Sequence, residues 1–210
     1  MPIITDMKMR RGRPERFIIT LDDEQELILT PEIVLKYSIA PQREYTEQAF
    51  LEILEEDARR QAKDQALRYL TRRPHSRLEL LRKMREKGFR TTVINLALDE
   101  LEKVDLVNDK DFTHLFILNE LRLRPVSRVL LAQKLIQRGI ARDLYEPLLD
   151  EMFSEQQELE MARELSEKFI KTHSQNKGQK LREKLVRFLQ GKGFNWEQIR
   201  QVIPQMNNDQ

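Results

Sequence analysis

Side chains that could hold a metal ion or act as a nucleophile are few and scattered in this chain of 210 residues. The three histidines, His75, His114 and His173, lie far apart in the sequence, and there is no cysteine. A zinc site needs three or four converging ligands, which this spacing does not supply. We therefore expect each histidine to be structural or exposed to solvent, and we expect no metal ion or other cofactor.

Other patterns typical of enzymes are also missing from the sequence. Gly191-Lys192-Gly193 follows a helical pattern, so it lacks the strand–loop–helix setting of a phosphate-binding loop. Asp109 and Asp111 fit the cap and first turn of a helix, and Asp22 to Glu24 fit a hairpin turn better than a cation site. No serine lies in the glycine-flanked setting of a hydrolase nucleophile. We predict that the chain is not an enzyme.

Basic residues are the remaining candidates for function, and their distribution is more informative than the net charge of +2. Positive and negative charge alternate in blocks. The net charges are −6 over residues 1–58, +9 over 59–90, −5 over 91–120, +6 over 121–142, −8 over 143–167 and +7 over 168–200. Either the blocks are solvated helix faces that pair with one another, or the basic blocks bind an anionic partner.

The composition predicts a mostly helical protein of the cytoplasm. Hydrophobic residues make up 40% and charged residues 34% of the chain, with 6 glycines and 8 prolines, and helix-forming residues are abundant. The absence of cysteine is typical of a reducing compartment. The sequence contains neither a signal peptide nor an apolar run of transmembrane length, so we expect no membrane association.

Three segments of the sequence align on a glycine that is followed by an apolar residue. They are residues 76–89, 127–140 and 181–194, with Gly88, Gly139 and Gly193 aligned. Apolar positions also match: Leu80 with Leu131 and Leu185, Met84 with Leu135 and Leu189, Ile94 with Tyr145 and Ile199, and Leu98 with Leu149 and Ile203. The sequence therefore contains a structural unit that is repeated three times.

Each unit is predicted to contain three helices. The first helices cover about residues 46–73, 109–123 and 155–171, the second are the aligned segments, and the third cover about 91–104, 142–153 and 195–203. The glycines can end a helix in the left-handed conformation, and the residues positioned as N-caps are Ser76, Asp109, Ser127 and Asn195. Units of this size bury little core alone, so we expect them to stack into an elongated array.

The N-terminal residues have a different pattern, with three short apolar segments that indicate strands. They are Ile3 to Met9, Phe17 to Leu21 and Glu26 to Thr30, and a short helix is predicted to begin at Pro31. The predicted fold class is all-α, with tandem three-helix repeats in an elongated array and a small N-terminal β-meander. The predicted domains are residues 1–45 (β-meander and short helix) and the three-helix repeats 46–107, 108–154 and 155–210.

The second helix of each unit has a basic face opposite its apolar face in a helical-wheel projection. These basic residues are Arg82, Lys83 and Lys87, then Lys134 and Arg138, then Lys184, Arg187 and Lys192. The helix macrodipole explains a cation at each helix end. It does not explain the cations of the preceding first helix, which are Arg59, Arg60, Lys63, Arg68, Arg72 and Arg73. Nucleic-acid phosphates are the common partner of such segments.

Most aromatic residues fall on apolar stripes and are predicted to lie in the core. They are Phe89, Phe112, Phe116 and Phe194. We expect Trp196, at the start of the last helix, to pack in the same way. Tyr69 could stack on a base because it lies in the basic first helix, but a core position explains it better.

Several of these segments resemble the RecX family. Those that resemble its first repeat and the following link are Ala66-Leu67-Arg68-Tyr69-Leu70, Arg73, Ser76, Glu79-Leu80, Lys87-Gly88-Phe89, Leu106, Asn108-Asp109 and Phe112. Those that resemble its second and third repeats are Arg138-Gly139-Ile140, Phe188-Leu189 and Lys192-Gly193-Phe194. The resemblance covers about residues 60–205, where three motifs of different sequence occur in the order that the family has. Arg124-Pro125 departs from the Gly-Pro step that is usual there.

The resemblance implies a regulator of the RecA recombinase. RecX-like proteins lie along the groove of the RecA filament on single-stranded DNA and limit its ATPase and strand exchange. We therefore expect the chain to bind the RecA filament and single-stranded DNA as a monomer, and to inhibit RecA. The expected contact residues are Arg68, Arg72, Arg73, Arg82, Lys83, Lys87, Arg128, Lys134, Arg138, Lys184, Arg187 and Lys192. A helix-turn-helix transcription regulator and a cytosolic scaffold without a nucleic-acid role remain as alternatives.

Overall fold

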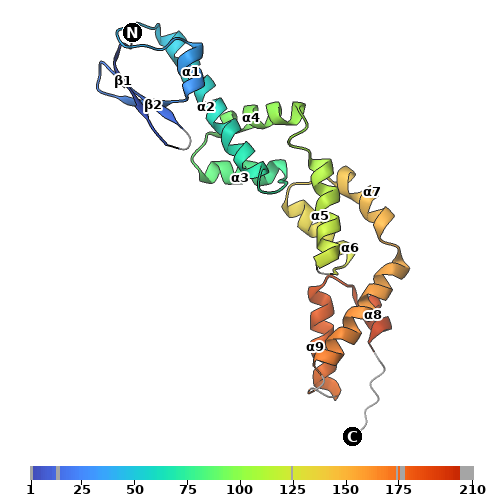
Figure 1. Cartoon of the computed structure of the whole chain (residues 1–210). Coiled ribbons are helices and arrows are strands. Elements are labelled where there is room, and N and C mark those ends of the chain that lie inside the picture. Colours follow the sequence, from blue (N-terminus) through green and yellow to red (C-terminus); the bar gives the residue numbers. More distant parts are fainter. Residues whose placement is uncertain (1, 13–14, 124, 174, 176–177, 204–210) are drawn as a thin grey trace. The chain divides into compact units, whose positions relative to one another are not determined.

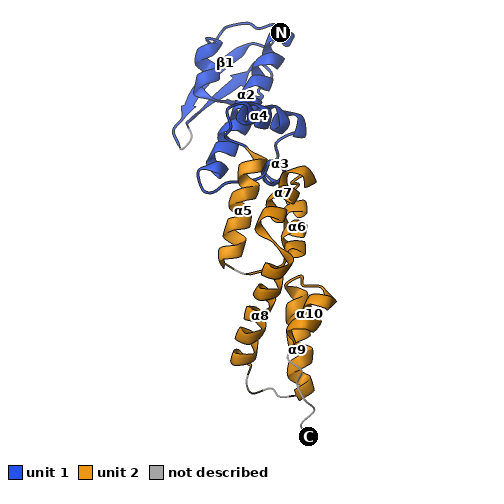
Figure 2. Ribbon diagram, turned by 90° about the vertical axis from the view of Figure 1, so that its right-hand side faces the viewer, with its two compact units in different colours: residues 1–107 blue, residues 108–210 orange. Residues whose placement is uncertain are grey.

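The computed structural model describes residues 2–12, 15–123, 125–173, 175 and 178–203, and within these residues it has ten helices and three strands (Figure 1). The chain divides into two compact units, residues 1–107 and residues 108–210 (Figure 2). Arg124, which departs from the family's usual glycine, lies outside the described residues. The mostly helical fold with a small N-terminal sheet confirms the predicted fold class.

The first unit begins with an antiparallel three-stranded sheet, as predicted. Its strands, in the order of pairing, are β1 (Ile4–Arg10), β2 (Arg16–Leu21) and β3 (Glu26–Leu29). The acidic residues between β2 and β3 form a turn, in which the Leu21 amide donates to the Gln25 carbonyl at 2.9 Å. Glu24 has a positive φ of 64° in this turn.

One face of the sheet packs against two helices, α1 (Pro31–Lys36) and the first half of α2 (Glu47–Leu70). Ile19 of β2 and Leu29 of β3 are buried there with Ile53 of α2. Burial of three branched or long apolar side chains contributes roughly 1.5–3 kcal/mol each. The long helix α2 thus carries the sheet at its N-terminal end.

A buried carboxylate also joins the sheet to α2. Asp57 of α2 accepts hydrogen bonds from the backbone amide of Thr30 at 2.8 Å and from the Thr30 hydroxyl at 2.7 Å. Its second oxygen accepts from Gln61 Nε2 at 2.5 Å. A buried carboxylate is unfavourable unless it is hydrogen-bonded, so these three donors allow Asp57 to occupy the core.

The second half of α2 forms the first three-helix domain with α3 (Arg77–Glu86) and α4 (Thr91–Lys103). Helix α3 begins at its N-cap Ser76, whose hydroxyl accepts from the Glu79 amide at 3.2 Å. It ends before Gly88, which has a φ of 87°. The predicted cap and the predicted left-handed glycine are both confirmed.

The second unit contains the other two three-helix domains. Their helices are α5 (Asp109–Leu123), α6 (Arg128–Gln137) and α7 (Arg142–Met152), then α8 (Glu155–Thr172), α9 (Gly178–Gly191) and α10 (Trp196–Val202). Ser127 caps α6 and Asn195 caps α10, as predicted. Gly139 and Gly193 have φ values of 77° and 85°, so both end their helices in the left-handed conformation.

The predicted cap of α5 is wrong by one residue. The side-chain oxygen of Asn108 accepts from the amides of Lys110 at 2.9 Å and Asp111 at 3.0 Å, while Asp109 is the first residue of the helix. Asparagine and aspartate cap helices about equally well, so their order in sequence does not decide between them. The carboxylates of the first turn then lie near the positive end of the helix dipole.

The sequence repeat is present in the structure as three separate cores. The aligned residues that are buried in them are Leu80, Leu131 and Leu185, Met84, Leu135 and Leu189, Ile94, Tyr145 and Ile199, and Leu98, Leu149 and Ile203. Within each domain these residues pack with side chains of the first helix. The glycine alignment therefore identified equivalent positions in three dimensions.

Within the second unit, hydrogen bonds join the second domain to the third. The Ser127 amide at the start of α6 donates to the Lys192 carbonyl at 3.0 Å. The Glu158 carboxylate of α8 accepts from the Arg128 amide at 2.8 Å and from Gln198 Nε2 at 3.0 Å. One carboxylate therefore bridges α6 of the second domain and α10 of the third.

The prediction for Trp196 is wrong, because 58% of this residue is exposed. Trp196 is the first residue of α10, whose buried residues are Ile199 and Val202. Phe112 and Phe194 are buried as predicted, whereas Phe116 packs half-buried at the edge of its core.

Candidate nucleic-acid interface

Equivalent arginines in the first and second domains bind carboxylates of their own domain. Arg77 of α3 contacts Asp99 of α4 at 2.7 Å, and Arg128 of α6 contacts the equivalent Asp150 of α7 at 2.5 Å. Arg128 also pairs with Glu146, and hydrogen bonds from this guanidinium hold the pKa of the Glu146 carboxyl below its usual value. The charge of Arg128, one of the predicted contact residues, is thus engaged inside its domain.

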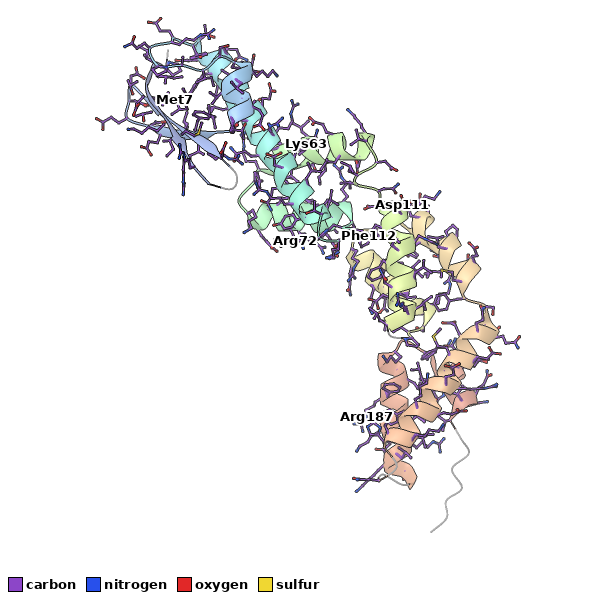
Figure 3. All side chains as sticks on the ribbon, in the orientation of Figure 1. Met7, Lys63, Arg72, Asp111, Phe112 and Arg187 are labelled. Carbon is purple, nitrogen blue, oxygen red and sulfur yellow. The ribbon has the colours of Figure 1, made fainter. Side chains whose placement is uncertain are left out.

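Acidic residues also neutralise part of the basic first helix. Arg59 and Lys63 of α2 contact Glu100 of α4 at 3.2 and 3.0 Å (Lys63 is labelled in Figure 3). In the second domain, Lys134 of α6 pairs with Glu120 of α5. Pairing between charge blocks therefore explains some of the alternation in the sequence, and Lys134 takes part in it.

Two predicted contact residues do not lie on an outer ridge, contrary to the helical-wheel prediction. Lys83 is half-buried, with its Nζ 3.0 Å from His75 Nε2 and 5.1 Å from the centre of the Tyr69 ring. The Arg138 guanidinium lies 4.2 Å from the centre of the Phe116 ring. A wheel shows one helix alone, whereas these long side chains lie along the neighbouring first helix of their domain.

Other predicted contact residues of the first domain remain exposed. Arg68 and Arg72 lie at the C-terminal end of α2 (Arg72 is labelled in Figure 3), and Lys87 is the C-cap of α3. None of the three forms an ion pair with another residue that the structure describes. Arg73 differs from them, because it contacts Glu79 at 2.9 Å. Three unneutralised cations are therefore available to an anionic partner in this domain.

The remaining predicted contact residues are divided between α3 and α9. Arg82 of α3 and Lys184 of α9 are exposed. Arg187 of α9, labelled in Figure 3, is exposed and lies 3.6 Å from the Glu183 carboxylate of the same helix. Lys192, after the end of α9, is half-buried. Exposed ion pairs of this kind contribute about 1 kcal/mol or less, so an external phosphate can compete with them.

The third domain has an exposed arginine that is not among the residues predicted from the sequence. Alignment on the glycines places Arg182 where Arg77 and Arg128 stand in the other domains. The third domain has Arg200 where the second has the pairing acid Glu146. Arg182 is exposed and forms no ion pair within the described part of the chain. The repeat alignment carried this signal, at the second residue of each aligned segment.

A stack of aromatic rings on the third domain is also missing from the sequence prediction. The ring centres of Phe169 (α8) and Phe188 (α9) are 4.7 Å apart, and the ring of His173 lies 4.0 Å from Phe169 with an angle of 13° between the planes. All three rings are half-buried. The position of Phe188 is occupied by Lys83 in the first domain and by Lys134 in the second.

His75 lies beside Lys83 in the first domain and has both ring nitrogens occupied. Its Nδ1 is 2.9 Å from the Arg73 carbonyl, and its Nε2 is 3.0 Å from Lys83 Nζ. A neutral imidazole satisfies both contacts, donating from Nδ1 and accepting from the lysine. Burial, with the nearby cations Arg73 and Lys83, lowers the pKa of His75, although its hydrogen bond to the Arg73 carbonyl opposes that shift.

The lowered pKa of His75 predicts that the first unit loses stability in mild acid. The unfolded chain binds a proton at His75 below about pH 6.5, whereas the folded chain does not until a lower pH. Stability contributed by neutral His75 is thus complete above about pH 6.5 and declines as the pH falls below it. Urea unfolding of the wild type and of His75→Gln across this range measures the difference.

The exposed His114 provides the control for this measurement. The pH profile of His114→Gln should follow that of the wild type, and His75→Gln should have the flatter profile. Equal pH profiles for wild type and His75→Gln would contradict a role for the buried imidazole.

Two features that would indicate other classes of function are absent from the described part of the chain. No three His, Cys, Asp or Glu side chains come together there as a metal site would require. None of the helices in that part of the chain combines the length and the apolar character needed to cross a membrane.

Comparison with protein families gives two matches. The first three-helix domain of RecX matches residues 62–101, and the third three-helix domain of RecX matches residues 155–203. The Regulatory protein RecX of Chlorobaculum tepidum is 32% identical over 150 residues, which cover 71% of this chain and 91% of that protein. The Regulatory protein RecX of Clostridium perfringens strain 13 is 27% identical over 212 residues, covering 99% of this chain and 97% of the relative.

Solved structures share the fold. A crystal structure of regulatory protein RecX superposes with a TM-score of 0.68 at 17% identity, over 96% of this chain and 98% of that one. The crystal structure of RecX from Lactobacillus salivarius gives a TM-score of 0.58 at 22% identity, over 70% of this chain and 94% of the other. With three-helix domains of matching sequence and a relative that is similar over nearly its whole length, the chain belongs to the RecX family of regulatory proteins.

Proposed function

We propose that this protein binds the RecA filament on single-stranded DNA and inhibits its ATPase and strand-exchange activities. Membership of the RecX family carries the proposal, because regulation of RecA is the function associated with that family. The surface of the domains supports it. Exposed cations on more than one three-helix domain allow one chain to contact several phosphates or protein surfaces, and linked contacts raise the overall affinity.

The proposed contact residues are exposed cations that were already predicted from the sequence. They are Arg68, Arg72, Arg82 and Lys87 in the first domain, and Lys184 and Arg187 in the third. Arg128, Lys134 and Arg138 pair with carboxylates or an aromatic ring of their own domain, so we assign them a structural role.

The experiment that tests the proposal measures ATP hydrolysis by RecA on single-stranded DNA. Increasing amounts of the purified protein should reduce the rate of hydrolysis in a saturable manner. Strand exchange between a single strand and a homologous duplex should fall over the same range of concentration. Unchanged rates at saturating protein would exclude inhibition of the filament.

A charge-neutralised variant tests the DNA contact. Arg68→Gln, Arg72→Gln and Lys87→Gln combined remove three exposed cations. The logarithm of the affinity for single strands falls linearly with the logarithm of the salt concentration, and each phosphate contact contributes about 0.7 to that salt slope. The salt slope of DNA binding should therefore decrease by roughly 2. Fluorescence anisotropy at several salt concentrations gives the slope, and circular dichroism checks that the helices are retained.

The matched control removes three cations from the sheet of the same unit. Lys8, Arg10 and Arg11 lie on or next to β1 and are exposed. Their combined change to Gln alters the net charge equally and should leave the salt slope close to that of the wild type. Equal slopes for both triple variants would mean that net charge, and not this surface, attracts DNA.

The alternative of a sequence-specific transcription regulator predicts a different binding profile. Such a protein prefers its site over random duplex by about a thousandfold or more. Selection from a random duplex pool tests this directly. We expect no enriched site, because phosphate contacts do not read sequence.

A further inference from the structure

We propose that the third three-helix domain is the part of this protein that holds the bases of single-stranded DNA, through the stacked rings of Phe169, Phe188 and His173. The inference rests on the proposed function and adds to it the domain and the type of contact. Two independent features of the third domain support it: its half-buried rings and the net positive charge of residues 168–200.

The rings are arranged as a platform. Phe169 stacks with Phe188 at 4.7 Å and with His173 at 4.0 Å, and all three are half-buried. They lie near the C-terminal ends of α8 and α9, and each ring remains partly accessible to solvent. Bases of single strands stack on such aromatic side chains with little regard to sequence, because every base has a π face.

Cations flank the rings at a regular spacing. Lys180, Lys184 and Phe188 follow one another at four-residue intervals along α9, and Lys192 follows at the same interval just after the helix ends. Lys180 and Lys184 are exposed, and Lys192 Nζ lies 5.6 Å from the centre of the Phe188 ring. Lysine has a flexible four-carbon chain, so the Lys192 ammonium can move from the ring to a phosphate.

The first two domains have a lysine at the position of Phe188. In the first domain it is Lys83, which lies over the Tyr69 ring, and in the second it is Lys134, which pairs with Glu120. In these two domains the position is therefore occupied by a cation that is engaged within the fold. In the third domain alone it is an aromatic ring with cations before and after it.

The third domain is strongly basic after the acidic segment Glu155 to Glu167 of α8. Residues 168–200 have a net charge of +7, with Glu183 and Glu197 as the acids in this block. Arg182 is exposed, and Arg200 replaces the acid that pairs with the equivalent arginine of the second domain. A surface with this excess of positive charge attracts a phosphate backbone, which would bring bases to the rings.

The test compares two single strands of equal length, one of oligothymidylate and one with abasic sites in place of the bases. Full-length protein should bind the strand with bases about fivefold tighter or more, the ratio expected for stacking of one base. Phe188→Leu should make the two affinities nearly equal and leave the salt slope unchanged. Phe188→Tyr retains a ring and should preserve the ratio.

A second variant and a control complete the test. Lys180→Gln, Lys184→Gln and Lys192→Gln combined should lower the salt slope by roughly 2 while retaining the preference for bases. Phe116→Leu removes a half-buried ring of the second domain, where Arg138 lies 4.2 Å from the ring centre, and should leave the preference unchanged.

The outcomes separate this inference from the proposed function. Equal affinity of the wild type for both strands would overturn the inference, and the rings would then serve only to pack α8 against α9. Inhibition of RecA by a protein without base preference would leave the proposed function intact. Base preference without any effect on RecA ATPase would support the stacking site and refute the proposed function.

Discussion

Replacing Gly193 with alanine is expected to destabilise the second unit by roughly 2–5 kcal/mol. Gly193 has a φ of 85°, a conformation in which an L side chain costs about 1–2 kcal/mol. A Cβ at this position would lie 2.7 Å from the Leu130 Cβ and 3.1 Å from the Leu130 amide nitrogen. The start of α6 must then shift, and overpacking of this kind costs about 1–3 kcal/mol. Urea unfolding followed by circular dichroism measures the loss.

Gly88→Ala is the matched control for this change. Gly88 is the equivalent residue of the first domain and has nearly the same φ of 87°, but an added Cβ would meet no atom within 4 Å. Its replacement should therefore cost only the backbone term, about 1–2 kcal/mol. Equal losses for the two variants would show that close packing of Gly193 against α6 contributes little.

The three-helix repeat could be predicted from the sequence because its signals are local. A glycine that must have a positive φ has few substitutes, and Gly88, Gly139 and Gly193 all meet that requirement. The apolar spacing before each glycine then fixes which face of the helix is buried. Leu80 and its equivalents were therefore located correctly without knowledge of their neighbours.

The charges were predicted less completely, because pairing depends on which helices pack together. The sequence left open whether the basic blocks pair internally or bind an anion. The described cations are of two kinds: Lys63 and Lys134 contact carboxylates of neighbouring helices, whereas Arg68 and Arg72 form no ion pair there. Residues of one charge block are thus either paired or unpaired, depending on the helix face on which each lies. The count of charges along the sequence does not contain that information.

Lys83 and Trp196 show where reasoning from a single helix fails. The wheel placed Lys83 opposite the apolar face, but its stem reaches the side of the domain where Tyr69 and His75 lie. Hydrophobicity favoured burial of Trp196, but the first turn of α10 buries Ile199 and directs the indole outward. In both cases the environment depends on how the helix packs in its domain, which the pattern of one helix does not contain.

Replacing Leu98 with alanine is expected to destabilise the first unit by about 2–5 kcal/mol. Leu98 is fully buried in the core of the first domain, at the position that Leu149 and Ile203 occupy in the other two. Shortening its isobutyl side chain to a methyl group loses the transfer free energy of the removed atoms and leaves a cavity that the surrounding helices fill only partly. Urea unfolding of the full chain gives the change in the free energy of unfolding.

Leu96→Ala provides a control in the same helix for the same chemical change. Leu96 lies two residues away on α4 and is 52% exposed, so its truncation should change the free energy of unfolding by about 0.5 kcal/mol or less. The pair isolates burial, because helix propensity and side-chain type are identical. The proposed DNA contacts Arg68, Arg72 and Lys87 lie on or at the ends of α2 and α3, which share the core around Leu98. Leu98→Ala should therefore also weaken DNA binding near its unfolding midpoint. A variant Leu98→Ala as stable as Leu96→Ala would mean that this core does not hold the three helices together.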